Sequence, residues 1–122
     1  MNQYLLSVYD VAGGAESSPP TSEQMHGFLA RVMALEEEMD TAGAFAFGGV
    51  LHGPDSVTVV SGGMDKVMTD GPFVEAKEHI GGFYIVNAES LDDALAWAAK
   101  VSHAIGQSIE VRPFRATGRL KV

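Results

Sequence analysis

The chain has 122 residues, of which 46% are hydrophobic and none is cysteine. We expect one domain over residues 1–122, because this length suits a single core, and the lack of thiols excludes disulfides, thiolate metal sites and cysteine nucleophiles. Sixteen acidic residues against eight Lys and Arg residues give a formal charge of −8, which disfavours binding to nucleic acid and to anionic membranes.

No apolar stretch approaches the ~20 residues that a membrane helix needs. The residues that follow Met1 also show no basic region ahead of an apolar one, the pattern of a secretory signal. We therefore expect a cytoplasmic protein that makes no membrane contact.

The first predicted element is a buried strand over residues 4–9, an apolar and aromatic run that Asp10 ends. Residues 11–20 contain Gly-Gly, Ser-Ser and Pro-Pro pairs, which do not sustain regular structure. This composition predicts a mobile loop.

A long helix is predicted next. Thr21 and Gln24 have the spacing of a capping box, in which each side chain binds a backbone N–H that the first turn leaves unpaired. Gly43 suits the C-terminal end of the helix. Apolar residues at spacings of three and four predict one core-facing stripe, formed by Met25, Phe28, Val32, Leu35, Met39 and Ala42.

The middle of the chain predicts a strand followed by a hairpin. Residues 44–51 fit a strand whose Gly48-Gly49 pair weakens it or marks a bulge. Two further strands are expected at residues 57–60 and 64–68. The Ser-Gly-Gly sequence at 61–63 between them suits a tight turn.

The C-terminal part predicts a strand, a second helix and a last strand. Residues 82–87 form an apolar strand, and Ser90 with Asp93 begins the helix. The helix should turn one face to the core, with Trp97 at its edge; that face consists of Leu91, Ala94, Leu95, Ala98 and Val101. Residues 108–113 alternate between apolar and polar, and Pro113 should end the pairing of this strand.

This order of elements predicts an α+β protein: a ferredoxin-like split βαβ domain with an inserted β-hairpin. Helices on one face of an antiparallel sheet leave the other face uncovered. Because the strands are rich in Val, Phe, Tyr and Ile, we expect two copies to pack sheet against sheet as a homodimer, the dimeric α+β barrel.

The segment after the hairpin combines a turn with a cluster of ionisable groups. Residues 70–73, Asp-Gly-Pro-Phe, have the chemistry of a turn. Glu75, Lys77, Glu78 and His79 follow at once, beside a glycine pair that allows backbone to approach a ligand. We expect ligand-binding groups among them. We expect no metal site, because a stable site needs three or more ligands and a helix would be required to bring Glu75 to His79.

The stretch 69–84 resembles the hallmark segment of the YCII-related, DGPF-domain family, and Ser90–Ala94 and Ile109–Pro113 also resemble it. The resemblance covers nearly the whole chain. In YCII relatives a histidine on the first helix, partnered by an aspartate, is the proposed acid–base pair, and a few members catalyse elimination or hydrolytic dehalogenation. Here Val32 stands at the expected histidine position, and His26 lies six residues earlier on another face.

His52 remains as a candidate, since it follows a predicted strand and Asp55 lies three residues on, where it could orient the imidazole. An exposed loop histidine beside a Pro-Asp turn is the alternative. We name His52, Asp70 and His79 as catalytic candidates and Glu75, Lys77 and Glu78 as ligand-binding candidates, in a cleft between sheet and helices.

Two functions fit these residues. The first is a small-molecule-binding protein or acid–base enzyme of YCII type with no cofactor, since no nucleotide-binding glycine motif or Gly-x-Ser-x-Gly elbow is present. The second is a non-catalytic dimeric interaction or regulatory protein, possible because genes of the DGPF family often accompany sigma-factor genes. Convergence of His52, Asp70 and His79 within hydrogen-bond reach in a cleft would favour the first, whereas scattered, exposed side chains would count against it.

Overall fold

The computed structural model describes residues 2–11, 21–62, 67–70 and 78–117. The loop predicted over residues 11–20 lies outside this part of the chain, apart from Val11. The elements in chain order are β1 (Asn2–Val11), α1 (Ser22–Thr41), β2 (Phe45–Val50), the short 3-10 helix η1 (Pro54–Ser56), β3 (Thr58–Ser61), β4 (Val67–Asp70), β5 (Glu78–Ala88), α2 (Leu91–Ile105) and β6 (Glu110–Pro113).

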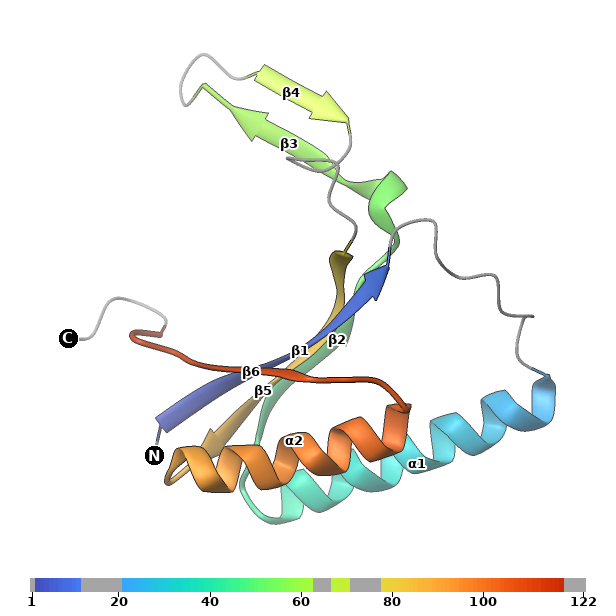
Figure 1. Cartoon of the computed structure of the whole chain (residues 1–122), viewed down its shortest axis with the longest axis vertical. Coiled ribbons are helices and arrows are strands. Elements are labelled where there is room, and N and C mark those ends of the chain that lie inside the picture. Colours follow the sequence, from blue (N-terminus) through green and yellow to red (C-terminus); the bar gives the residue numbers. More distant parts are fainter. Residues whose placement is uncertain (1, 12–20, 63–66, 71–77, 118–122) are drawn as a thin grey trace.

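Four of the strands form an antiparallel sheet in the order β2-β5-β1-β6. Both helices lie against the same face of this sheet (Figure 1). The protein is therefore α+β, and its topology is consistent with the predicted ferredoxin-like fold.

The start of α1 is the predicted capping box. The Gln24 amide donates to Thr21 Oγ1 at 3.1 Å, and the Thr21 amide donates to Gln24 Oε1 at 2.9 Å. Gly43, at φ 74°, lies just beyond the C-terminal end of the helix in the left-handed region that glycine adopts readily. Both ends of the helix are confirmed.

The predicted apolar stripe of α1 is only partly correct. Leu35 and Met39 are buried, whereas Met25 is 40% exposed and Ala42 is exposed. The N-terminal half of α1 extends past the end of α2 (Figure 1), so the apolar residues there have little to pack against. Periodicity identified the face of the helix correctly but not the length over which that face is covered.

The core lies between α2, the C-terminal half of α1 and the sheet. Ala94, Ala98 and Val101 of the predicted α2 face are buried, while Leu91 and Leu95 are 49% and 44% exposed. Trp97 packs at the edge of the core, as predicted. The other buried apolar residues are Tyr4, Leu6, Leu35, Met39, Ala44, Val86, Ala88 and Ala104.

The predicted hairpin is present as a separate two-stranded sheet of β3 and β4. Gly62, at φ 83°, follows β3 with the positive φ expected of the turn. The second strand was placed too early, since β4 begins at Val67 rather than at residue 64, and the connection is longer than the predicted tight turn. Figure 1 shows the hairpin standing beyond the end of the main sheet, on the side away from the helices.

Strand β5 begins earlier than predicted, at Glu78 rather than Gly82. The cause is the length of β1, which continues to Val11 and pairs with the additional residues: Asp10 with His79 and Val11 with Glu78. A register shift accompanies this extension, since Val8 pairs with Gly82 but Tyr9 pairs with Ile80. Gly81 is therefore the extra residue of a β-bulge.

The face of the sheet away from the helices, called here the open face, is largely apolar. Leu5, Ser7 and Tyr9 of β1 alternate with the core residues Tyr4 and Leu6 and so point to this side. The pairing register and ring contacts add Phe47, Phe83 and Ile85. Ser7 is fully buried among its neighbours, whereas Phe47 and Tyr9 are exposed, and no helix among the described residues lies against this face.

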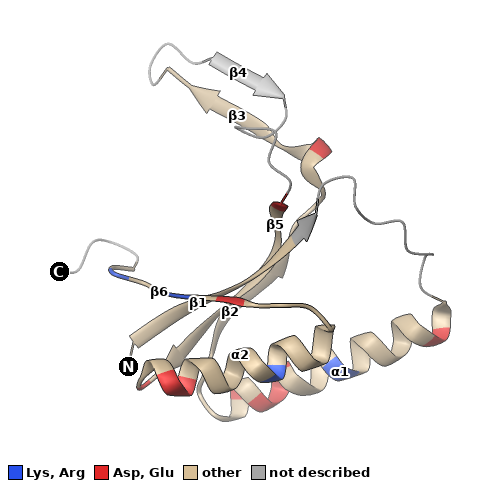
Figure 2. Cartoon of the chain, viewed as in Figure 1, with Lys and Arg blue, Asp and Glu red and all other residues tan. Residues whose placement is uncertain are grey.

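Charge is unevenly distributed between the layers (Figure 2). The helices hold Arg31 and Lys100 against a larger acidic group, consisting of Glu23, Glu36, Glu37, Glu38, Asp40, Asp92 and Asp93. The described strands carry few charges. Neither helix is long and apolar enough to cross a membrane.

Candidate functional site

A tyrosine and a glutamate meet between the sheet and α1. The Tyr84 hydroxyl on β5 donates a hydrogen bond to Glu36 Oε2 on α1, and both side chains are half-buried. We call them the Tyr84–Glu36 pair. The hydrogen bond from the phenol fixes the orientation of the carboxylate oxygens.

Neighbouring residues hold the Tyr84 ring in place. Phe45 packs edge-on against it, with ring centroids 6.0 Å apart. Gly48 lies across from Tyr84 in the sheet, and a Cβ atom at position 48 would come within 2.5 Å of Tyr84 Cδ1. The glycine thus provides the space in which the ring lies.

Burial raises the pKa of Tyr84, and the hydrogen bond to Glu36 with the negative charge of its carboxylate raises it further. The phenol, already protonated at neutral pH at its ordinary pKa, thus stays protonated into more alkaline solution. It is the hydrogen-bond donor of the pair.

His79 lies on β5 as Tyr84 does, nearer the N-terminal end of the strand. The bulge at Gly81 shifts the alternation of β5, so the pairing of His79 with Asp10 places it on the helix-facing side that also carries Gly82 and Tyr84. His79 is half-buried. Val50, paired with Gly82 on β2, is 91% exposed, so this end of the sheet is accessible to solvent.

His52, another candidate, is exposed in the loop after β2. The amide of its neighbour Leu51 donates to the Gly81 carbonyl at 2.8 Å. The backbone thus brings His52 to the same end of the sheet as His79, although within the described residues no hydrogen bond joins them. His52 makes none with Asp55 either.

Asp70 ends β4 in the separate hairpin, opposite Thr58. Glu78 is exposed at the start of β5, in a strand rather than the loop that we expected. Glu75 and Lys77 lie outside the described residues. The strand conformation at Glu78 and His79 also rules out a helix there, and the described part of the chain contains no group of three potential metal ligands.

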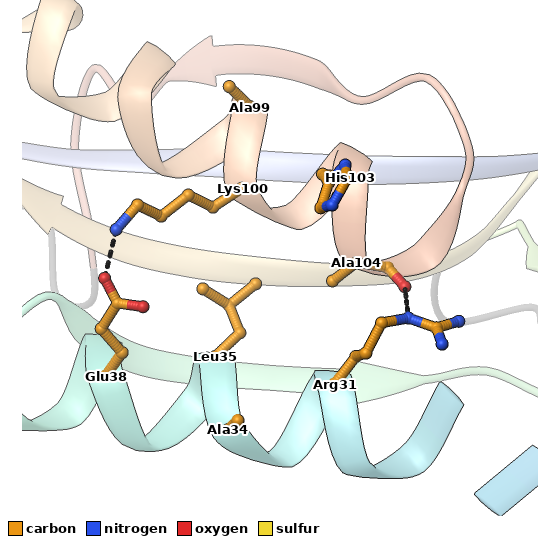
Figure 3. A pocket seen from close by; sticks show the side chains of 8 residues that line it. All are labelled: Arg31, Ala34, Leu35, Glu38, Ala99, Lys100, His103 and Ala104. Carbon is orange, nitrogen blue, oxygen red and sulfur yellow. Dashed lines mark hydrogen bonds and ion pairs between the residues drawn. The ribbon is translucent and has the colours of Figure 1, made fainter. Parts of the chain in front are cut away.

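A groove of about 510 Å³ runs between the outer sides of α1 and α2 (Figure 3). Ala34, Leu35 and Ala104 form part of its apolar lining. At one end Arg31 Nε donates to the Ala104 carbonyl at 3.1 Å, and at the other Lys100 pairs with Glu38. Arg31 and Lys100 therefore already bind the C-terminal end of α2 and the carboxylate of Glu38, so the residues of this groove hold the two helices together.

The sequence matches a family model described as YCII-related domain over residues 3–115. The chain belongs to the YCII-related family. The match spans every helix and strand of this YCII-related protein except the first residue of β1.

An uncharacterised protein of Rhizobium meliloti is 45% identical to this YCII-related chain over 51 residues. The aligned region covers 40% of this chain and 41% of that protein. The relative therefore shares part of the sequence and carries no named activity.

Sequence reasoning missed the Tyr84–Glu36 pair. Glu36 lies one helical turn after Val32, the position at which the resemblance leads to a histidine, and so shares its side of α1. A search for other polar residues on that side would have found Glu36. Nothing in the sequence connects it to Tyr84, 48 positions away.

Proposed function

We propose that this YCII-related protein binds a small organic molecule beside the Tyr84–Glu36 pair and transfers a proton there. The single observation that supports this is the half-buried carboxylate of Glu36, oriented by a phenol whose pKa is raised. Perturbed titratable groups with a specific partner are typical of functional sites.

The chemistry follows from the two oxygens of Glu36. Oε2 accepts the hydrogen bond from Tyr84, and Oε1 takes a proton from an acidic C–H or O–H group of the ligand. Glu36 then holds the proton as a carboxylic acid and returns it to the product or to water. His79 and His52, at the end of the same sheet, supply polar contacts to a ligand that extends along β5, and Asp70, Glu75, Lys77 and Glu78 remain candidates for its outer part.

The test is a thermal-shift screen of metabolite-sized organic compounds, because a ligand that binds the folded state raises the melting temperature by mass action. Compounds that stabilise the wild type are then titrated into Glu36→Gln and Tyr84→Phe. We expect at least tenfold weaker binding to both, equivalent to ~1.4 kcal/mol. Glu37→Gln, at the exposed neighbouring position, is the matched control and should bind as the wild type does.

A purely structural role of the pair leads to another result. In that case Glu36→Gln and Tyr84→Phe would lower the melting temperature of the free protein yet leave the compound affinities unchanged. That outcome, or a screen without any stabilising compound, would reject the proposal.

We also propose that two copies pair through their open faces as a dimeric α+β barrel. Phe47 is 58% exposed there, and its ring lies 5.9 Å from that of Phe83, so the two form an aromatic surface against which no described helix packs. The second candidate function, a non-catalytic interaction or regulatory protein, draws its support from this surface, and a link to sigma factors rests on family resemblance alone. Light scattering at increasing concentration tests the dimer.

A further inference from the structure

The β3–β4 hairpin has few packing partners within the part of the chain that the structure describes. Among the described residues, its two strands of four residues pack extensively only with each other. An isolated two-stranded hairpin is at best marginally stable in water, because two strands bury too little apolar surface to offset the lost chain entropy. The other described elements therefore do not supply the surface that would stabilise the hairpin.

The exposed residues suit contact with protein. Val60 in β3 is 57% exposed, and Phe47 and Leu51, in β2 and directly after it, are 58% and 46% exposed. The described strands near them carry few charges, whereas the acidic residues gather on the helices (Figure 2). Interface cores are typically depleted of charge in this way.

The area of the open face points to the same conclusion. Four strands at the usual spacing and about six residues of length make a flat surface of roughly 19 by 20 Å, on the order of 400 Å². A stable dimer buries about 800 Å² on each partner. Each protomer would give one hairpin and receive one, which adds on the order of 250 Å².

We infer that the hairpin of each protomer packs on a second copy of this chain and completes the interface that the open faces begin. The inference rests on the proposed dimer and adds a part to it. The hairpin projects away from the helices (Figure 1), so it extends to the side on which the partner's sheet would lie. We call this contact between the hairpin and the partner the clasp. Because the strand that ends in Asp70 belongs to the hairpin, the clasp also brings a candidate site residue to the partner.

Hydrogen exchange of the wild-type protein gives the first test. The amides of β3 should be protected at concentrations where the dimer forms and should lose that protection on dilution to the monomer. The amides of β1 and β5 should stay protected in both states. A dimer in which the β3 amides exchange freely overturns the clasp while leaving the sheet-to-sheet dimer intact.

Three substitutions of the same kind give the second test. Val60→Asp should raise the dimer dissociation constant at least tenfold, and Phe47→Asp should do so through the open face. Met33→Asp, at a 67% exposed apolar position on α1, is the control and should leave it unchanged. If only Phe47→Asp raises the dissociation constant, the clasp is rejected. If Met33→Asp raises it equally, or if the wild type is monomeric, both the clasp and the barrel are rejected.

Discussion

The ring of Tyr84 leaves no room for a methyl group at position 48. Gly48→Ala should lower the free energy of unfolding by about 1–3 kcal/mol, the usual cost of forcing an atom into a packed site. Gly49→Ala is the control, because a Cβ there meets no atom within 4 Å. Urea denaturation of both variants measures the difference, and equal stabilities would show that the ring moves aside.

Tyr84 should also make stability depend on pH in alkali. In the unfolded chain its phenol ionises near the ordinary pKa of 10.0, while burial and Glu36 keep it protonated to higher pH in the folded protein. Its contribution is therefore full below about pH 10 and is lost as the pH rises from there towards the folded pKa, at up to ~1.4 kcal/mol per pH unit.

Urea denaturation from about pH 9 to pH 11 measures this loss. The decline should be shallower in Tyr84→Phe, which has no proton to release at this position. If the two proteins lose stability in parallel, Tyr84 ionises equally easily in both states, and the pair does not hold the phenol protonated.

At the scale of single residues, the sequence predicted local contacts, such as helix caps, better than contacts between residues far apart in the chain. The caps at Thr21 and Ser90 are local, so their spacing sufficed, and the Ser90 side chain accepts from the Asp93 amide as expected. The Tyr84–Glu36 pair joins residues far apart in the chain and depends on how α1 lies over β5. His79 was expected in a loop but lies in β5, because its strand partner is the unforeseen end of β1.

The two helices differ in how firmly their first turns are held. No residue in the first turns of α1 is buried, whereas Ala94, in the first turn of α2, is fully buried. Ser90→Ala should therefore cost about 1 kcal/mol of global stability. Thr21→Ala should cost less and should instead increase local amide exchange at the start of α1, because these turns can open without breaching the core.

Denaturant unfolding and hydrogen exchange of Thr21→Ala and Ser90→Ala separate the two effects. An equal global cost would mean that the N-terminal half of α1 is packed more firmly than its exposure indicates. The contrast also explains why the sequence predicted helix ends well and burial poorly. Capping chemistry is confined to a few neighbouring residues, while burial depends on the relative lengths of α1, α2 and the sheet.

The separation of charge between layers has a consequence for the whole molecule. The acidic residues of the helices repel one another, and salt screens this repulsion. The melting temperature should therefore rise on going from low to moderate salt. Glu37→Lys, at an exposed position in the acidic run of α1, should raise stability by a few tenths of a kcal/mol at low salt and reduce the salt effect.

Calorimetry at two sodium chloride concentrations provides the comparison. A melting temperature that falls with salt would show that attractive pairs, such as Lys100 with Glu38, outweigh the repulsion. At the scale of the molecule the sequence predicted the order of elements and therefore the topology, because split βαβ connections leave few alternatives. The sequence did not predict where the hairpin lies relative to the main sheet, because its two strands pair only with each other.

The β-bulge at Gly81 determines which side of the sheet His79 and Ile80 face. Strict alternation counted back from Gly82 would assign Ile80 to the helix side and His79 to the open face; the extra residue exchanges them. Related chains that lack a residue at this point should keep both side chains facing as they do here, since deletion restores regular pairing without rotating the strand. An insertion of one more residue would also restore regular pairing, and would keep the imidazole on the helix side but move it farther from Tyr84 along the strand.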